Sequence, residues 1–384
     1  MSDDKTEILD FSYYLPVNII FGCGKADTAG KLARPYGEKA LIVTGRSSAK
    51  KSGLYDRIAS SLEQSGMSHL LFDKVTQNPL TTTAEEGASL ARENNCDVII
   101  GIGGGSIMDC AKAIAFLAVN TGDINDYIYN RQKSENALPL ILIPTTCGTG
   151  SEGNGFAVLT NPENGDKKSL RCNAIIPKAS IVDPECMMTM PKKVLASVGF
   201  DALCHCMEAY TSKNAQPFTD ALCEYAMRLT AENLVRVYKG QGDTPTWEKL
   251  TLASTIGGMV INTAGVTLAH GMEHPASGLK NIVHGQGLAA LTPAVIEVSQ
   301  KGNPAKFRKI SEILSGGTDA DCVAAIRGLR KELELDCTLS ELGIRKEDIP
   351  WMSENCMKVS AASVAANPVV FTEAEIAKIY EKAL

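Results

Sequence analysis

The chain has 384 residues, of which 44% are hydrophobic and 21% charged, and its formal net charge is −6. This composition is typical of a globular enzyme, and the length predicts two domains, because a single core rarely grows so large. An acidic balance without a basic cluster argues against nucleic-acid binding. The polar segment Met1–Glu7 lacks a signal-peptide core, and no apolar run predicts a membrane span. We therefore expect a cytoplasmic protein, whose twelve cysteines, without a Cys-x-x-Cys pair, are reduced.

Short apolar runs alternate with helical patterns in the first half of the chain. Such alternation predicts a parallel sheet with helices on both faces, which binds ligands at the carboxyl ends of its strands. After about residue 190 the apolar spacing is helical nearly throughout. We therefore predict an α/β domain over residues 1–188 and an all-α domain over residues 189–384. The expected strands are 18–21, 40–44, 69–75, 97–101 and 140–143, and the expected helices are 52–65, 83–94, 106–119, 194–212, 218–238, 246–263, 287–299 and 305–314.

Four of the five histidines gather in two short segments. Asp201 and His205 are four residues apart, as are His270 and His274, so each pair shares one face of a helix. His284 follows a turn-prone Ser-Gly pair and could return to the same place from a separate helix start. One carboxylate and three imidazoles, with one of His270 and His274 among them, suit a divalent transition metal, iron or zinc before magnesium or calcium.

Two loops rich in glycine or hydroxyl side chains follow predicted strands. Gly103, Gly104 and Gly105 precede a helix, whose free N–H groups and dipole favour a pyrophosphate. Ser106 stands where the usual dinucleotide fingerprint has a third glycine, so this loop alone is a weak signal. The second loop, Pro144–Glu152, has four hydroxyl side chains and two glycines, which could hold phosphates or a ribose. It lacks the Gly-Lys-Ser/Thr of a P-loop, which disfavours ATP chemistry.

Together these segments resemble the iron-containing, or group III, alcohol dehydrogenase family. They occur in the family's order over most of the chain, and their spacings agree. The matching segments are Gly103-Gly-Gly-Ser-x-x-Asp-x-x-Lys112, Pro144-Thr-Thr-x-Gly-Thr-Gly-Ser-Glu152, Asp183-Pro184, Gly199-x-Asp-Ala-Leu-x-His-x-x-Glu-Ala-Tyr210, and His270-x-x-x-His274 with His284-Gly285.

The resemblance implies a dehydroquinate synthase-like fold, with a cleft between the nucleotide-binding and helical metal-binding domains. It implies that Asp201, His205, His270 and His284 bind Fe²⁺, or Zn²⁺ as the alternative. His274 matches the non-ligand histidine beside the nicotinamide and is expected to act in catalysis. The cofactor, NAD or NADP, is expected to contact Gly45, Ser47, Asn78, Gly105, Ser106, Thr145, Thr146, Thr149, Ser151, Lys168 and His274, with Lys168 preferred to Lys167.

The turn after the second strand bears on the choice between NAD and NADP. Gly45 stands where NAD-preferring members often place an aspartate, which binds the adenosine ribose and repels a 2′-phosphate. Here the chain reads Gly45-Arg-Ser-Ser-Ala-Lys-Lys51, whose hydroxyls and cations could accept that phosphate. NADP preference and an ordinary basic turn both remain open at this point.

The resemblance implies reversible hydride transfer between NAD(P)(H) and a small alcohol or aldehyde, in a homodimer or larger assembly. Within the same architecture, a glycerol dehydrogenase or a redox-neutral, dehydroquinate synthase-like lyase are the alternatives. A metallohydrolase would suit the carboxylate and histidines but leaves the glycine loops without a role. A non-catalytic nucleotide-binding module leaves the metal set unexplained.

Overall fold

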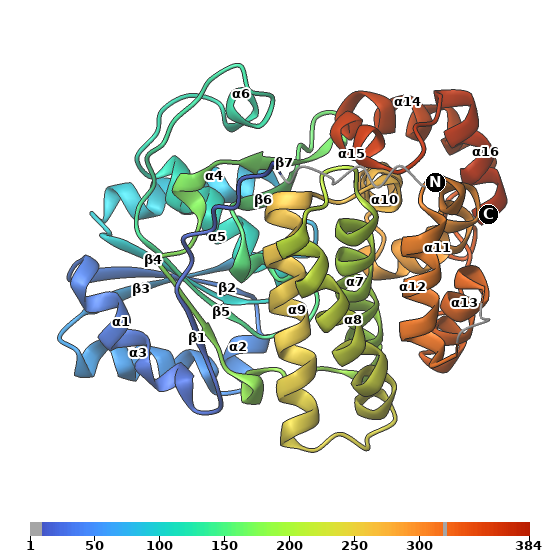
Figure 1. Ribbon diagram of the computed structural model, residues 1–384. Helices are drawn as coiled ribbons and strands as arrows, with labels where there is room; N and C mark the ends of the chain where they lie inside the picture. The colour runs from blue at the N-terminus through green and yellow to red at the C-terminus, as the bar shows by residue number, and fades with distance from the viewer. Residues whose placement is uncertain (1–9, 318–320) are drawn as a thin grey trace.

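The computed structural model describes residues 10–317 and 321–384, and a parallel sheet forms the centre of its N-terminal half (Figure 1). The polar segment Met1–Glu7 lies outside the described residues. Six strands pair in the order β1-β8-β5-β4-β2-β3, all parallel. They are β1 (Ile19–Phe21), β2 (Lys39–Gly45), β3 (Ser68–Val75), β4 (Val98–Gly103), β5 (Leu140–Pro144) and β8 (Ala179–Val182).

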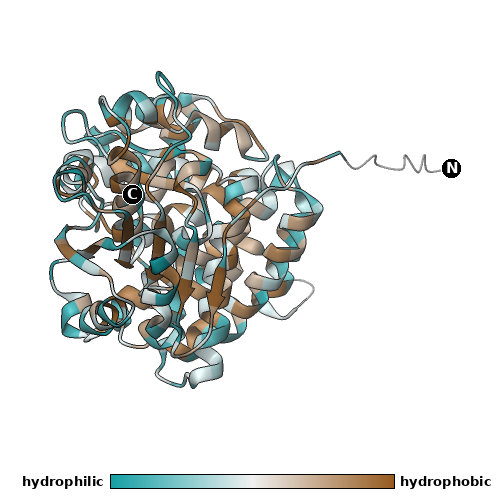
Figure 2. Cartoon of the chain, turned by 90° about the vertical axis from the view of Figure 1, so that its left-hand side faces the viewer, coloured by the Kyte–Doolittle hydropathy of each residue, from teal (hydrophilic) through white to brown (hydrophobic). Residues whose placement is uncertain are grey.

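Helices cover both faces of this sheet. Leu41 and Val43 of β2 pack with α4 and α5, whereas Ala40 and Ile42 pack with α1 and α3 on the other face. The strands at the centre are accordingly apolar, with polar surfaces on the outer sides of the helices (Figure 2). A strand buried on both faces needs a continuous apolar run, which is why the sequence pattern revealed these strands. The helices are α1 (Ala29–Ala33), α2 (Ser48–Lys51), α3 (Leu54–Gln64), α4 (Thr81–Glu93), α5 (Gly105–Leu117) and α6 (Ile124–Ile128).

Three central strands bring the predicted cofactor loops together. β2, β4 and β5 are adjacent, and their register places Thr44 beside Ile102 and Gly103 beside Pro144. The loops that follow these strands therefore leave the sheet at one edge, the carboxyl edge. Ligands bind there in open parallel sheets.

An antiparallel pair of strands, β6 (Phe156–Thr160) and β7 (Lys167–Arg171), was not among the predicted elements. β6 contacts α5, and β7 contacts α10 (Leu268–Lys280) of the helical half, so the pair lies where the two halves meet (Figure 1). β7 reads Lys-Lys-Ser-Leu-Arg, a polar sequence without the apolar signature of a strand. β8 was also missed; its four residues make a short signal.

The second half is helical, as predicted: from Lys192 onward the described residues form helices and no strand. The division at residues 188/189 stays a prediction. In the described part of the chain no single helix could cross a membrane by length and composition; α9 and α10 pass that test only together, as a pair bent by 102°. The helices are α7 (Lys192–Thr211), α8 (Pro217–Tyr238), α9 (Thr244–Ala264), α10 (Leu268–Lys280), α11 (His284–Ser299), α12 (Pro304–Ser315), α13 (Cys322–Glu332), α14 (Ile349–Val359), α15 (Ala361–Ala366) and α16 (Glu373–Ala383).

Candidate metal centre and cofactor cleft

Helix α7 carries three buried polar residues on one face, Asp201, His205 and Glu208. Their spacing of four and then three residues places them one above the other along the helix. α7 packs against α8, α9 and α11, so this face is enclosed by other helices rather than by water. Buried groups of this kind need partners, which α10 and α11 supply.

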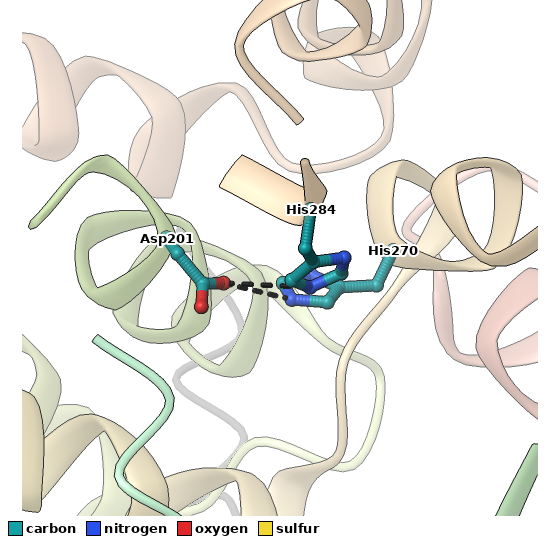
Figure 3. Close-up of side chains that lie close together, drawn as sticks. All are labelled: Asp201, His270 and His284. Carbon is teal, nitrogen blue, oxygen red and sulfur yellow. Dashed lines mark ion pairs between the residues drawn. The ribbon is translucent and has the colours of Figure 1, made fainter. Parts of the chain in front are cut away.

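His270 lies on α10, and His284 is the first residue of α11. Asn281 ends α10 in the left-handed conformation, with φ of 51°, and the chain then turns back toward α7. The Nε2 atoms of His205, His270 and His284 lie 3.6, 3.4 and 3.6 Å from Asp201 Oδ1. Figure 3 shows Asp201, His270 and His284 pointing toward one another from three helices. The structure thus brings together all four residues that the resemblance implies as ligands.

Two further buried carboxylates hold the histidine rings. His270 Nδ1 lies 2.6 Å from Glu208 Oε1, while the other Glu208 oxygen accepts a hydrogen bond of 2.7 Å from the Thr267 amide. His284 Nδ1 is hydrogen-bonded to Glu273 Oε2, and Glu273 also accepts from the Ser277 hydroxyl. A carboxylate at Nδ1 fixes the tautomer and orients the ring, so each Nε2 presents its lone pair toward Asp201.

The centre of the site contains two buried polar atoms without a hydrogen-bond partner among the described residues, Asp201 Oδ1 and His270 Nε2. Each such atom costs about 1–3 kcal/mol unless something binds it. One carboxylate with three imidazoles is a donor set for iron or zinc. The residues present therefore fit a divalent transition metal.

The charges around His205 and His270 agree with this fit. Burial lowers the pKa of His205 to about 4, so its imidazole is neutral at pH 7, as a metal ligand must be. Burial also disfavours the charged form of His270, but Glu208 and Asp201 outweigh it and raise its pKa to about 10. Two carboxylates around one imidazole favour a positive charge between them, which a bound divalent cation would supply.

These ligands line a cavity of about 130 Å³ that extends to the carboxyl edge of the sheet. His274 lines it too, with its ring centroid 5.8 Å from that of His284. Burial and the Lys167 cation lower the pKa of His274 well below its ordinary value, so this ring is neutral. Other lining residues come from the cofactor loops (Ser106, Thr149 and Ser151), from β6 and β7 (Phe156, Val158, Lys167, Ser169 and Arg171), and from the helical half (Ile261 and Val266).

The two cofactor loops pack closely on each other. α5 begins at Gly105, and a Cβ atom on this residue would lie 2.3 Å from Thr149 Cγ2, so the approach requires glycine. A Cβ on Gly104 would similarly lie 3.1 Å from Thr146 Oγ1. The Thr145 amide donates to the Gly103 carbonyl. Ser106, Thr145, Thr146 and Thr149 are all half-buried around the N-terminus of α5, where a pyrophosphate binds well.

Lys112, in the motif after the glycines, holds the loop Pro144–Glu152 through hydrogen bonds. Its ammonium group is fully buried and lies 2.7–2.9 Å from four acceptors, two of them on Ser151 and the others on Asn154 and Phe156. The Ser151 hydroxyl donates to Asp109, whose other oxygen accepts from the Val158 amide. Ser151, predicted to contact the cofactor, lines the cavity but has its hydroxyl committed to this network.

The two candidate lysines of β7 point in opposite directions, because neighbours in a strand alternate. Lys168, the preferred choice, donates to the Val359 carbonyl at 2.6 Å and is absent from the cavity lining among the described residues. Lys167 lines the cavity, with its Nζ 3.5 Å from Glu273 Oε2. Lys167, and not Lys168, therefore lines the described cavity, and which of the two contacts the cofactor stays a prediction.

The remaining predicted cofactor contacts lie along the same edge. Asn78 lines the cavity with φ of 49°, and its Nδ2 donates to Asn281 Oδ1 at 2.7 Å, which joins the sheet to the helical half. Gly45 is the last residue of β2, and Ser47 is the exposed N-cap of α2. Neither residue lines the described cavity, and both lie farther along the edge, beyond the loops around α5.

Sequence reasoning passed over Glu273 and Arg171, preferred Lys168 to Lys167, and named Glu208 only within a motif. Glu208 could have been found, since it lies seven residues after Asp201 and thus on the ligand face of α7. Glu273 stands one residue from His274, with no local spacing that points to His284. Its role depends on the turn between α10 and α11.

Dinucleotide-type loops beside a carboxylate–histidine centre are typical of metal-dependent dehydrogenases, and comparison with known proteins gives the same class. The sequence model of one protein family, described as iron-containing alcohol dehydrogenase, matches residues 16–184. A second family model, described as the C-terminal part of the Fe-containing alcohol dehydrogenase family, matches residues 195–384. The chain belongs to the iron-containing alcohol dehydrogenase family. Resemblance and comparison therefore agree, and the predicted two-part fold is confirmed.

Individual relatives extend over nearly the whole chain. Alcohol dehydrogenase 4 of Saccharomyces cerevisiae is 34% identical over 377 residues, which cover 97% of this chain and 98% of that protein. An NAD-dependent methanol dehydrogenase of Bacillus methanolicus is 30% identical over 381 residues, covering 97% of this chain and 100% of that one. The crystal structure of an archaeal halo-thermophilic alcohol dehydrogenase from a Red Sea brine pool has a TM-score of 0.94 at 33% identity, covering 98% of this chain and 99% of that one. Fe²⁺ and NAD fit a metal-dependent alcohol dehydrogenase of this family.

Proposed function

We propose that Asp201, His205, His270 and His284 hold a divalent iron and that the chain interconverts short alcohols and aldehydes with a nicotinamide cofactor. The observation that carries this proposal is the convergence of three Nε2 atoms on Asp201 Oδ1, with unpartnered buried atoms at the centre. When bound, the metal supplies a Lewis acid for the substrate oxygen, an effect worth several kcal/mol.

The surrounding residues bind and orient the reactants. The N-terminus of α5 at Gly105 and Ser106 binds the pyrophosphate, and Thr149 and Lys167 line the cavity on the way to the metal ligands. A nicotinamide cofactor held along these residues would present its C4 to the substrate carbon for hydride transfer. His274, neutral and beside His284, relays the alcohol proton or positions the nicotinamide.

Single-histidine variants test these assignments. His270→Ala and His284→Ala should lose bound metal and activity together, because each removes one donor. His274→Ala should retain metal and lower kcat, by about 10²-fold to 10⁴-fold if it transfers the proton. Metal content by elemental analysis and cofactor oxidation at 340 nm, with Fe²⁺ added anaerobically and a panel of short aldehydes, measure both effects. Loss of metal from His274→Ala would refute its non-ligand role.

The same assay separates the competing functions. A net change in absorbance at 340 nm supports a dehydrogenase over a redox-neutral lyase, which regenerates its cofactor. Short alcohols are the proposed substrates because relatives include a methanol dehydrogenase and a 1,3-propanediol dehydrogenase. Oxidation of glycerol in preference to monohydric alcohols would favour the glycerol dehydrogenase alternative.

We further propose that the turn after β2 accepts the 2′-phosphate of NADP. Gly45 has no carboxylate to repel it, and Arg46, Ser47 and Ser48 are exposed there. A Cβ on Gly45 would lie 3.6 Å or more from its neighbours, which is ordinary van der Waals contact, so the first atom of an aspartate side chain can be placed there. The proposal expects a higher kcat/KM for NADPH than for NADH. In Gly45→Asp the kcat/KM for NADPH should fall at least about tenfold. Comparable values for both cofactors in the unaltered protein would remove the preference.

Cytoplasmic location and a homodimer or larger assembly stay predictions. Cell fractionation tests the first, and size-exclusion chromatography with light scattering tests the second. A single species at the 40.9 kDa of one chain would contradict the expected assembly.

A further inference from the structure

The β6–β7 pair forms one wall of the active-site cavity. Every second residue of β7 lines the cavity, namely Lys167, Ser169 and Arg171. Lys168 and the buried Leu170 lie on the other side of the strand. Lys167 and Arg171 are four residues apart, or about 13 Å along an extended strand. The wall therefore presents two cations at separate places, one at each end of β7.

The two cations differ in their partners. Lys167 lies 3.5 Å from Glu273, the carboxylate that holds His284, so its charge is offset within the metal centre. Arg171 has no carboxylate partner and no hydrogen bond to any residue within 10–317 and 321–384. Its guanidinium group stacks on the Phe156 ring instead, 4.4 Å from the centroid. The stacking limits its motion and leaves its N–H donors available.

Apolar side chains accompany Arg171 in the cavity lining. Phe156 and Val158 come from β6, and Ile261 and Val266 come from α9 and the loop after it. Such a surface suits a short aliphatic chain. Arg171 is an exposed residue that lines the same cavity, and its guanidinium group suits a planar or tetrahedral anion, which it binds through two parallel hydrogen bonds.

From this geometry we infer that the preferred substrate is a short aliphatic aldehyde or alcohol whose far end carries a carboxylate or sulfonate, and that Arg171 binds this anion. The inference rests on the proposed function, since the reacting end of the substrate is taken to lie at Asp201 and the histidines. It makes Arg171 a determinant of specificity. Arg171 acts on the bound chain end, away from the hydride transfer.

The test compares three aldehydes in the metal-loaded enzyme: 4-oxobutanoate, 3-sulfopropanal and neutral butanal. The unaltered protein should show its highest kcat/KM for one of the anionic aldehydes, and the better one identifies the acid group. Arg171→Gln should lower kcat/KM for that aldehyde about 10-fold to 100-fold, mainly through KM. Its kcat/KM for butanal should not change, and Arg171→Lys should recover part of the loss.

Arg131→Gln is the matched control, because Arg131 pairs with Asp126 and is absent from the described cavity lining. It should leave the values for all three aldehydes unchanged. A preference for butanal in the unaltered protein, or an equal loss for charged and neutral aldehydes in Arg171→Gln, would overturn the inference.

If the proposed dehydrogenase function is wrong, the aldehyde assays will show no activity with any variant, which differs from a changed preference among aldehydes. If no aldehyde is reduced, succinate binding to the metal-loaded protein, measured by calorimetry, still tests the anion site. Weaker succinate binding by Arg171→Gln than by Arg131→Gln would support the role of Arg171. Equal binding by the two variants would overturn it.

Discussion

Glu208 and Glu273 are the residues that orient two of the three ligand histidines, His270 and His284. Each accepts a hydrogen bond at Nδ1 of one ring, and each has a second oxygen bound by a neighbouring group. Both are buried, so they keep a charge only because the imidazole, backbone and hydroxyl donors surround them. Glu273 also holds Lys167, which links the metal centre to the cofactor cleft.

Glu273→Gln should weaken metal binding about tenfold or more, because the neutral amide orients His284 less firmly and no longer offsets Lys167. Competition with a chelator of known affinity measures the change for Fe²⁺ or Zn²⁺. Glu297→Gln is the control: Glu297 pairs with Lys382 on the surface and should leave the affinity unchanged. Equal affinities for Glu273→Gln and the control would show that His284 is held without its carboxylate.

At the scale of elements, α9 packs against the second cofactor loop through a contact between two glycines. A Cβ on Gly258 would lie 1.8 Å from the Gly150 carbonyl oxygen, so the helix can approach the loop only without a side chain. The preceding residue, Gly257, faces α7, and a Cβ there would meet its nearest atom at 3.4 Å. Two adjacent glycines thus have different packing requirements.

Gly258→Ala should lower the free energy of unfolding by about 1–3 kcal/mol, since α9 or the loop must shift to admit the methyl group. Gly257→Ala should be neutral or stabilising, because alanine favours a helix by up to about 1 kcal/mol. Denaturant unfolding of both variants measures the difference. Similar stabilities would mean that the loop moves away from α9 at little cost.

At the scale of the whole molecule, the halves meet along α9, the β6–β7 pair and the Asn78–Asn281 hydrogen bond, with the metal ligands on the helical side. Metal binding should raise the stability of the native state, because the unfolded chain has no assembled donor set. Free metal at a concentration of about 100 times Kd stabilises the native state relative to the unfolded chain by about 2.7 kcal/mol.

Calorimetry should therefore show a Tm about 3 °C higher with Fe²⁺ or Zn²⁺ than with a chelator. His270→Ala should lose this increase. His69→Ala should keep it, since His69 pairs with Glu63 in the sheet half, apart from the ligands. An unchanged increase in His270→Ala would place the metal elsewhere.

Much of this arrangement was already determined by local sequence. β2, β4 and β5 are buried on both faces, and such strands need continuous apolar runs. Asp201 and His205 are four residues apart because both lie on one face of α7. The glycines before α5 and the histidines of α10 could likewise be identified from the chain alone. These features depend on neighbours within one or two turns, so a local pattern records them.

The tertiary structure decided what depends on contacts between distant segments. β7 pairs with β6 despite its polar sequence, because one side of the pair faces a cavity built by other elements. Strand alternation turned Lys167, and not Lys168, toward Glu273. Arg171 became a cavity residue through the same register. No local pattern encodes such contacts, since their partners lie tens to hundreds of residues away and meet only when the two halves pack.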